Sequence, residues 1–132
     1  KKHWGILHGY KPYQIKYSCG FYSSHSTGFF VKRKVAEKVG FYNIKYKYHA
    51  DYDYFYRLIV KNKMRGISTK KNEIIGIFRR GGFSSKISFW KKLKEDIRIR
   101  YDNGQNIFLL ILIFINKFLR NIDQILKDIT NK

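Results

Sequence analysis

The segment DYDYFYRLIVKNK, at 51–63, has the side-chain spacing of one helix face. The apolar and aromatic residues that follow this spacing are Tyr52, Phe55, Tyr56 and Ile59. Asp51 and Asp53 stand at its start, where the helix dipole favours negative charge. Asp53 and Arg57 lie four residues apart and can pair on the helix surface. We therefore expect a helix with one buried side and a structural Asp53–Arg57 pair at its beginning.

Strand and helix signals alternate around this segment. Residues 29–31 combine Phe, Phe and Val and predict a short buried strand, and 33–40 predict a helix that ends at its glycine. Residues 73–80 mix β-branched and aromatic side chains and predict a second strand. From Ser88 the spacing is helical again, interrupted once by DNGQN at 102–106. The expected fold class is α/β with a helical C-terminal tail.

The chain is strongly basic. Its 132 residues fit one domain, and 28 Lys and Arg residues against 9 Asp and Glu residues give a formal charge of +19. Such a surplus predicts attraction to the phosphates of nucleic acid, anionic lipid or a nucleotide substrate. The excess of Lys over Arg, with abundant Ile, Tyr, Phe and Asn, is equally the pattern that an AT-rich genome imposes. Charge alone therefore selects no partner.

Cysteine and hydropathy patterns bear on the compartment. With Cys19 as its single cysteine, the chain can form no intrachain disulfide and no cysteine zinc cluster, which fits a reducing compartment. Residues 1–14 contain no continuous apolar core of the kind found in a signal peptide. The longest apolar run, at 107–115, is too short for a bilayer span, which needs about 20 residues. We expect a cytoplasmic protein, or one held peripherally on the inner face of the membrane.

Four sequence pieces occur in a recognisable order: SSHSTGFFVKRKVAEKVGFYN, YKYHADYDYFYRL, IGIFRRGGFSS and IRIRYDNGQN. Their order and spacing over residues 20–106 resemble the C-terminal half of a family 2 inverting glycosyltransferase of the bacterial polysaccharide-assembly type. The resemblance implies a partial GT-A-like fold, the C-terminal half of a Rossmann-like nucleotide-sugar transferase fold. Residues 1–104 would form the acceptor and catalytic-base part, and 105–132 an amphipathic helical tail.

The resemblance assigns a role to Asp51, which takes the place of the family's catalytic aspartate. An inverting transfer from a nucleotide sugar needs a carboxylate that removes the proton of the acceptor hydroxyl. The alternative is that Asp51 only caps the helix, with Asp53 in the first turn. A metal site at Asp51 and Asp53 is disfavoured, because the family's metal-binding DxD follows a hydrophobic strand, whereas YKYKYHA precedes this pair. No metal ligand is assigned in this chain, and the Mg or Mn ion of a complete enzyme would be held mainly by an N-terminal half.

Substrate contacts are implied at two further places. His25 matches a family histidine and would line the cleft near the sugar or the acceptor, unless it is a structural hydrogen-bonding residue. Arg79 and Arg80 precede Gly81 and Gly82, and guanidinium groups beside glycines suit diphosphate oxygens. The alternative is that both arginines sit on a solvated strand end.

The sequence also departs from the family pattern. Asn43 stands where the family usually has aspartate, and His49-Ala50 replaces a pair that often carries a second carboxylate. No nucleotide-binding half is present, so we expect this chain alone to be inactive. Two alternatives stay open: a basic, aromatic-rich module that binds nucleic acid or anionic membrane, although no nucleic-acid fold signature is matched, and an inactive remnant.

The tail places apolar residues on one stripe among Lys, Arg and Asp, namely Phe118, Ile122, Ile125 and Ile129. Such a helix can pack on its own domain, on a partner, or in the plane of a membrane, where basic charge favours anionic lipid. A lipid-linked acceptor, which the resemblance allows beside a glycan acceptor, would suit peripheral membrane contact through 105–129.

Overall fold

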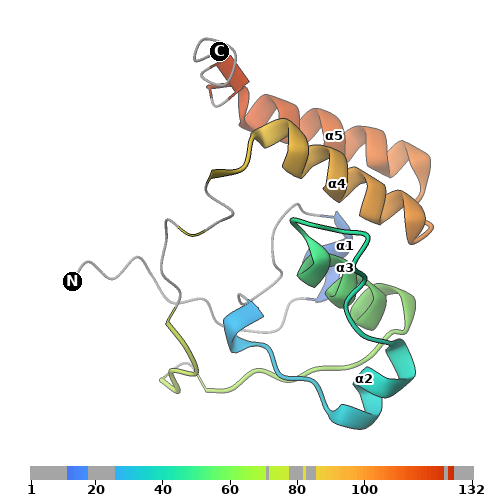
Figure 1. Cartoon of the computed structure of the whole chain (residues 1–132), viewed down its shortest axis with the longest axis vertical. Coiled ribbons are helices and arrows are strands. Elements are labelled where there is room, and N and C mark those ends of the chain that lie inside the picture. The colour runs from blue at the N-terminus through green and yellow to red at the C-terminus, as the bar shows by residue number, and fades with distance from the viewer. Residues whose placement is uncertain are drawn as a thin grey trace.

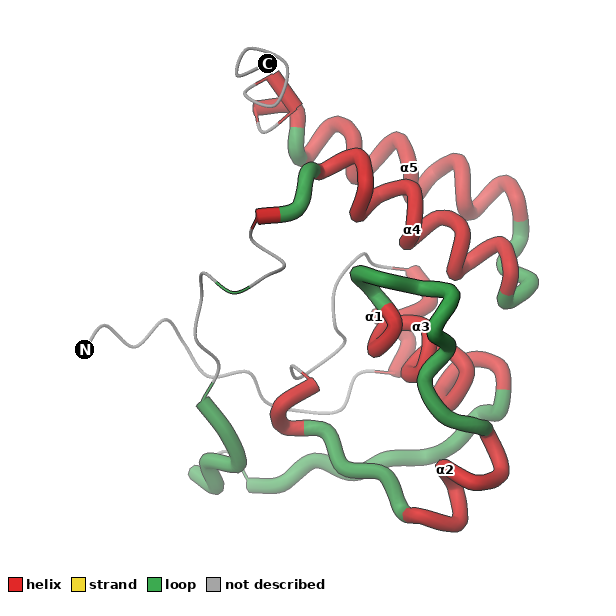
Figure 2. Tube along the Cα trace, viewed as in Figure 1, coloured by secondary structure: helices red, strands yellow, loops and turns green. Residues whose placement is uncertain are grey.

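The computed structural model describes residues 12–17, 26–70, 72–77, 82, 86–123 and 125–126. All regular elements in these ranges are helical, as Figure 2 shows. They are α1 (Pro12–Tyr17), a 3-10 turn (Ser26–Gly28), α2 (Arg33–Val39), α3 (Ala50–Tyr56), a π-helical turn (Arg57–Lys61), α4 (Phe89–Asp102) and α5 (Ile107–Arg120). The predicted α/β class, with its partial GT-A-like, Rossmann-like architecture, is therefore wrong for this part of the chain.

The two predicted strands are the source of this error. Residues 29–31 and 73–77 have no regular structure, and 78–80 lie outside the described ranges. A strand satisfies its backbone groups by pairing with a neighbouring strand, and none is present among the described residues. Burial differs between the two segments: Phe29 and Val31 pack partly buried against the main core while Phe30 is 79% exposed, and all of 73–77 is exposed, with Ile77 at 81%. β-branched composition alone therefore did not produce a sheet.

The predicted helices are present. α2 ends where expected, at Gly40, whose φ of 84° is readily accessible to glycine. α4 and α5 follow the predicted pattern, and residues 103–106 separate them. The helical tail expected over 105–132 is not one helix, because α5 ends at Arg120 and a turn follows at Asn121. α3 runs into the π-helical turn, so that helical backbone extends over 50–61. Its first residue is Ala50 and His49 precedes it, which places Asp51 inside the first turn rather than at the cap.

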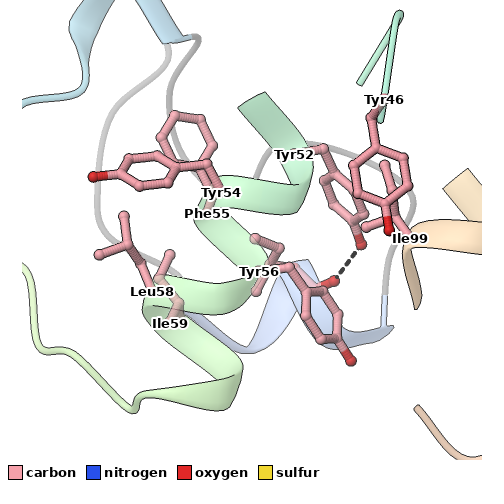
Figure 3. Close-up of a cluster of buried hydrophobic side chains, with 9 residues drawn as sticks. Tyr46, Tyr52, Tyr54, Phe55, Tyr56, Leu58, Ile59 and Ile99 are labelled. Atoms are coloured by element: carbon pink, nitrogen blue, oxygen red, sulfur yellow. Dashed lines mark hydrogen bonds between the residues drawn. The ribbon is translucent and has the colours of Figure 1, made fainter. Parts of the chain in front are cut away.

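α3 forms the centre of the main core (Figure 3). Its side chains are buried almost all round, because α1, α2, α4 and the π-helical turn surround it. The Tyr52 hydroxyl donates a hydrogen bond of 2.8 Å to the Ile15 carbonyl of α1. The buried apolar and aromatic residues of this core are Ile15, Tyr46, Tyr52, Tyr54, Phe55, Tyr56, Leu58, Ile59 and Ile99.

α4 and α5 run side by side in opposite directions and form a second layer (Figure 1). Leu110 and Ile113 of α5 are each 3% exposed, and the Lys117 ammonium lies 2.8 Å from the Asp96 carboxylate of α4. Beyond α5, Ile125 packs with Phe89 and Leu93 at the beginning of α4. The helix pair thus joins the C-terminal tail to the body of the protein.

Candidate functional site

The start of α3 is held from α4 by a single carboxylate. Glu95 accepts hydrogen bonds from three successive backbone N–H groups, those of Lys47 (3.1 Å), Tyr48 (2.6 Å) and His49 (2.7 Å). Hydrogen bonds between N–H groups and a charged acceptor are among the stronger ones in proteins. Glu95 thereby fixes the backbone that leads directly into the turn carrying Asp51.

Asp51 is partly exposed and makes no ion pair within the described part of the chain. One carboxylate oxygen accepts the neighbouring Tyr52 N–H at 2.8 Å. Its negative charge is felt by Tyr42, whose pKa is raised first by burial and then by Asp51. The lack of a cation partner among the described residues is notable in a chain of charge +19. Asp51 is therefore partly accessible from solvent.

Asp53 has a different environment. It is 1% exposed, and both of its oxygens are occupied: Oδ2 lies 2.9 Å from Arg57 Nε, and Oδ1 accepts from Asn103 Nδ2 at 2.9 Å. The predicted Asp53–Arg57 pair is thus present, but in the interior rather than on the helix surface. With Asp53 occupied, the two aspartates do not fit a shared metal ion. Among the described residues, no three His, Cys, Asp or Glu side chains gather as a potential metal site.

Arg57 extends this link to α2. Its Nη1 donates to the Val39 carbonyl (2.9 Å) and its Nη2 to the Phe41 carbonyl (2.6 Å). The guanidinium also lies over the Tyr54 ring, 5.5 Å from its centroid. Asp53 and Arg57 therefore organise the segment that brings Tyr42 beside Asp51.

His49, immediately before α3, is the other titratable group at this place. Its Nδ1 is buried and has no hydrogen-bond partner among the residues that the structure describes. Burial lowers the pKa of His49, and Lys117 adds to this effect, whereas the charges of Asp96, Glu95 and Asp51 oppose it. His49 is consequently held in its neutral form close to Asp51.

Most of the predicted substrate-binding residues lie outside the part of the chain that the structure describes. His25, Arg79, Arg80 and Gly81 lie outside the described residues. Gly82 is described and exposed, and a Cβ added there would meet no atom within 4 Å. Within the described residues, the structure pairs Asp53 with Arg57 and places Asp51 in the first turn of the same helix.

A hollow of about 480 Å³ opens elsewhere, near the other end of the α3 region. Its lining includes Lys16, Tyr56, Lys61, Asn103 and Gln105, whereas Asp51 does not line it. The polar side of this hollow is already organised, since Gln105 Oε1 accepts from the Tyr56 hydroxyl and Gln105 Nε2 donates to the Lys16 carbonyl. The hollow and Asp51 are separate features of the surface.

The sequence patterns did not reveal Glu95, which binds the backbone before Asp51, or Asn103, which binds Asp53. Their partners lie far along the chain, 46 to 48 residues from Glu95 and 50 residues from Asn103. No local spacing marks such contacts.

Comparison with protein-family models, with curated proteins and with solved structures finds no match for this chain.

Proposed function

We propose that this chain contributes the acceptor side and the catalytic base of an inverting glycosyltransferase, with Asp51 as the base. The donor would be a nucleotide sugar, and the acceptor a hydroxyl group of a glycan or of a lipid-linked sugar. One observation carries the proposal: Asp51 is a partly exposed carboxylate without a cation partner in the described part of the chain, on a backbone that Glu95 holds in place. The motif order described above supplies the reaction class.

The proposed step needs little from the protein beyond this carboxylate. The acceptor oxygen forms a bond to the anomeric carbon while its proton passes to Asp51. The bond from that carbon to the diphosphate breaks, and the nucleotide leaves with the electron pair. A positioned general base typically contributes about 10²–10⁴-fold to the rate.

The remaining roles rest on motif order alone. Arg79 and Arg80, beside Gly81 and Gly82, are assigned to the diphosphate, and His25 to the sugar or the acceptor. Because Asp53 is occupied by Arg57 and Asn103, the metal and most of the nucleotide are assigned to residues outside this sequence. The single cysteine supports a cytoplasmic location.

The test compares Asp51→Asn with unmodified protein in the longest gene product that contains this chain. Sugar transfer from labelled nucleotide sugars is expected to fall by about 10²–10⁴-fold with the melting temperature unchanged. Asp123→Asn, which changes another exposed aspartate, serves as the control and should retain full activity.

Two results would overturn the proposal. One is an Asp51→Asn enzyme that transfers sugar at the normal rate. The other is tight binding of DNA or RNA by this protein that weakens steeply with salt, together with no affinity for nucleoside diphosphates.

A further inference from the structure

The outer face of α5 is apolar and exposed. α5 turns Leu110 and Ile113 toward α4, and these residues are buried. The opposite side carries Phe108, which is 73% exposed, and Leu112, which is 63% exposed. The set of exposed apolar residues on this side, called here the outer stripe, is Phe108, Ile111, Leu112, Ile115 and Leu119; Ile122 and Leu126 are also exposed but follow the end of α5 at Arg120.

The outer stripe is continuous along the helix. Four of its members, Phe108, Leu112, Ile115 and Leu119, follow one another at intervals of four, three and four residues within α5. At about 3.6 residues per turn this spacing keeps all of them on one side. Scattered exposed apolar residues are ordinary in proteins, but an aligned row of large ones marks an interaction surface.

Aromatic residues extend this surface onto α4. Trp90 is partly exposed, and its ring centroid lies 6.2 Å from that of Phe118 of α5. Tyr101 stands eleven residues after Trp90, a spacing that places it on the same side of α4, and it is 65% exposed. Trp and Tyr are the side chains preferred at the headgroup level of a bilayer.

The charge around the outer stripe is positive. The acidic groups of α4 are engaged within the protein: Glu95 by backbone N–H groups, Asp96 by Arg100 and Lys117, and Asp102 by Lys45. The exposed cations of this helix pair are Lys91, Lys94 and Arg98 on α4 and Arg120 on α5; Arg98 lies 3.8 Å from Asp102, and the one exposed aspartate just beyond α5 in the described residues is Asp123. These cations attract an anionic surface.

We propose that the outer stripe of α5, with the adjoining edge of α4, docks on an anionic membrane surface. α5 lies in the plane of the interface, with its apolar side chains inserted among the headgroups and Trp90 and Tyr101 at their level. No described helix is long and apolar enough to cross a bilayer. The docking rests on this surface and is independent of the glycosyl transfer proposed above.

The positive charge favours a membrane over the other possible binding partners of the outer stripe. A second copy of the chain would bring two molecules of formal charge +19 together and repel. A neutral protein groove would bury the stripe but leave the cations beside it without partners. An anionic bilayer supplies both an apolar layer and negative charge.

The test measures binding of the chain to vesicles of phosphatidylcholine alone and of phosphatidylcholine with phosphatidylglycerol. A Trp4→Phe background leaves Trp90 as the single tryptophan, so that its emission reports on the interface. We expect binding to the anionic vesicles, a blue shift of the Trp90 emission, and weaker binding as salt is added. Vesicles of phosphatidylcholine alone should bind much less.

Two double variants distinguish membrane binding through the outer stripe from non-specific hydrophobic binding. Leu112→Ser with Leu119→Ser should reduce binding by at least about tenfold, because two exposed leucines no longer enter the bilayer. The control, Ile44→Ser with Ile67→Ser, removes two side chains that are 99% and 97% exposed elsewhere, and it should bind normally. Circular dichroism checks that both variants fold, which is expected since all four residues are exposed.

Three results would overturn the proposal: equal binding to neutral and anionic vesicles, normal binding by the Leu112→Ser, Leu119→Ser variant, and self-association in analytical ultracentrifugation that this variant abolishes. The last result would assign the outer stripe to a second copy of the chain.

Discussion

Arg57 and Asp53 form an ion pair of 2.9 Å inside the protein, whereas Arg33 and Glu37 form an ion pair of the same length on its surface. Both pairs join residues four positions apart on a helix. The Asp53 side chain is 2% exposed, and that of Arg33 is 92% exposed. Comparing the two pairs therefore distinguishes the effect of burial on stability from the effect of the ion-pair contact itself.

Replacing Arg57 with Met should destabilise the protein markedly. The Asp53 carboxylate would stay buried without its cation, and the carbonyls of Val39 and Phe41 would lose their donors. We expect the free energy of unfolding to fall by about 3 kcal/mol, measured by urea denaturation. Arg33→Met is the matched control and should leave stability unchanged within error. Equal effects of the two substitutions would contradict the structural role given to Arg57.

Replacing Glu95 with Gln should loosen the start of α3. The amide keeps one acceptor oxygen but brings an NH₂ group toward three backbone donors. We expect the amides of Lys47, Tyr48 and His49 to exchange with solvent deuterium about tenfold faster or more, as a lost charged hydrogen bond implies. Glu73→Gln, which alters a carboxylate that accepts from Lys70 N–H in an exposed loop, should not change these amides. Unchanged exchange in Glu95→Gln would show that the helix start is held by other contacts.

His49 should make stability depend on pH. Because burial lowers its pKa in the folded protein, the unfolded chain binds a proton near pH 6.5 while the folded chain does not. The unfolded state then holds more protons, so the free energy of unfolding falls as the pH drops below about 6.5, by at most about 1.4 kcal/mol per pH unit. This loss ends at the folded pKa of His49.

Urea denaturation between about pH 7.5 and about pH 5.5 measures this effect. His49→Gln should show a flatter dependence than the unmodified chain. Asp102 does not contribute in this range, because hydrogen bonds from Lys45 and Tyr46 lower its pKa below the usual 3.8. Identical pH profiles for the two proteins would exclude His49 as the cause.

The helices could be predicted from the sequence because their hydrogen bonds close within one segment. The spacing at 33–40, 51–63 and 88–120 therefore carried enough information. A strand depends on a neighbouring strand, and the local sequence does not identify that neighbour. Ile74 and Ile77 have strand-like composition, yet the described chain provides no strand beside them, and their side chains are 76% and 81% exposed.

In the candidate site, too, only the contacts within one segment could be predicted from the sequence. The four-residue interval predicted the pairing of Asp53 with Arg57, and the family-like motifs singled out Asp51. That Asp53 is buried, and that Asn103 binds its second oxygen, depends on how α4 packs against α3. A tertiary arrangement of this kind is not encoded in any short motif.

Arg100 provides the last prediction, because it is a buried cation that the sequence patterns did not reveal. It is 0% exposed and contacts three acceptors: Asp96 at 3.2 Å, the Lys16 carbonyl at 2.9 Å and Gln105 Oε1 at 3.0 Å. The planar guanidinium reaches these groups in different directions, and the single ammonium of lysine cannot do so.

Arg100→Lys should therefore lower the free energy of unfolding by about 3 kcal/mol, although it conserves the charge. Arg98→Lys is the matched control on the same helix, because the Arg98 side chain is 57% exposed and lies 3.8 Å from Asp102, and it should have no measurable effect. Urea denaturation of both variants measures the difference. If Arg100→Lys proves as stable as Arg98→Lys, charge rather than guanidinium geometry holds α1 and α4 together at this point.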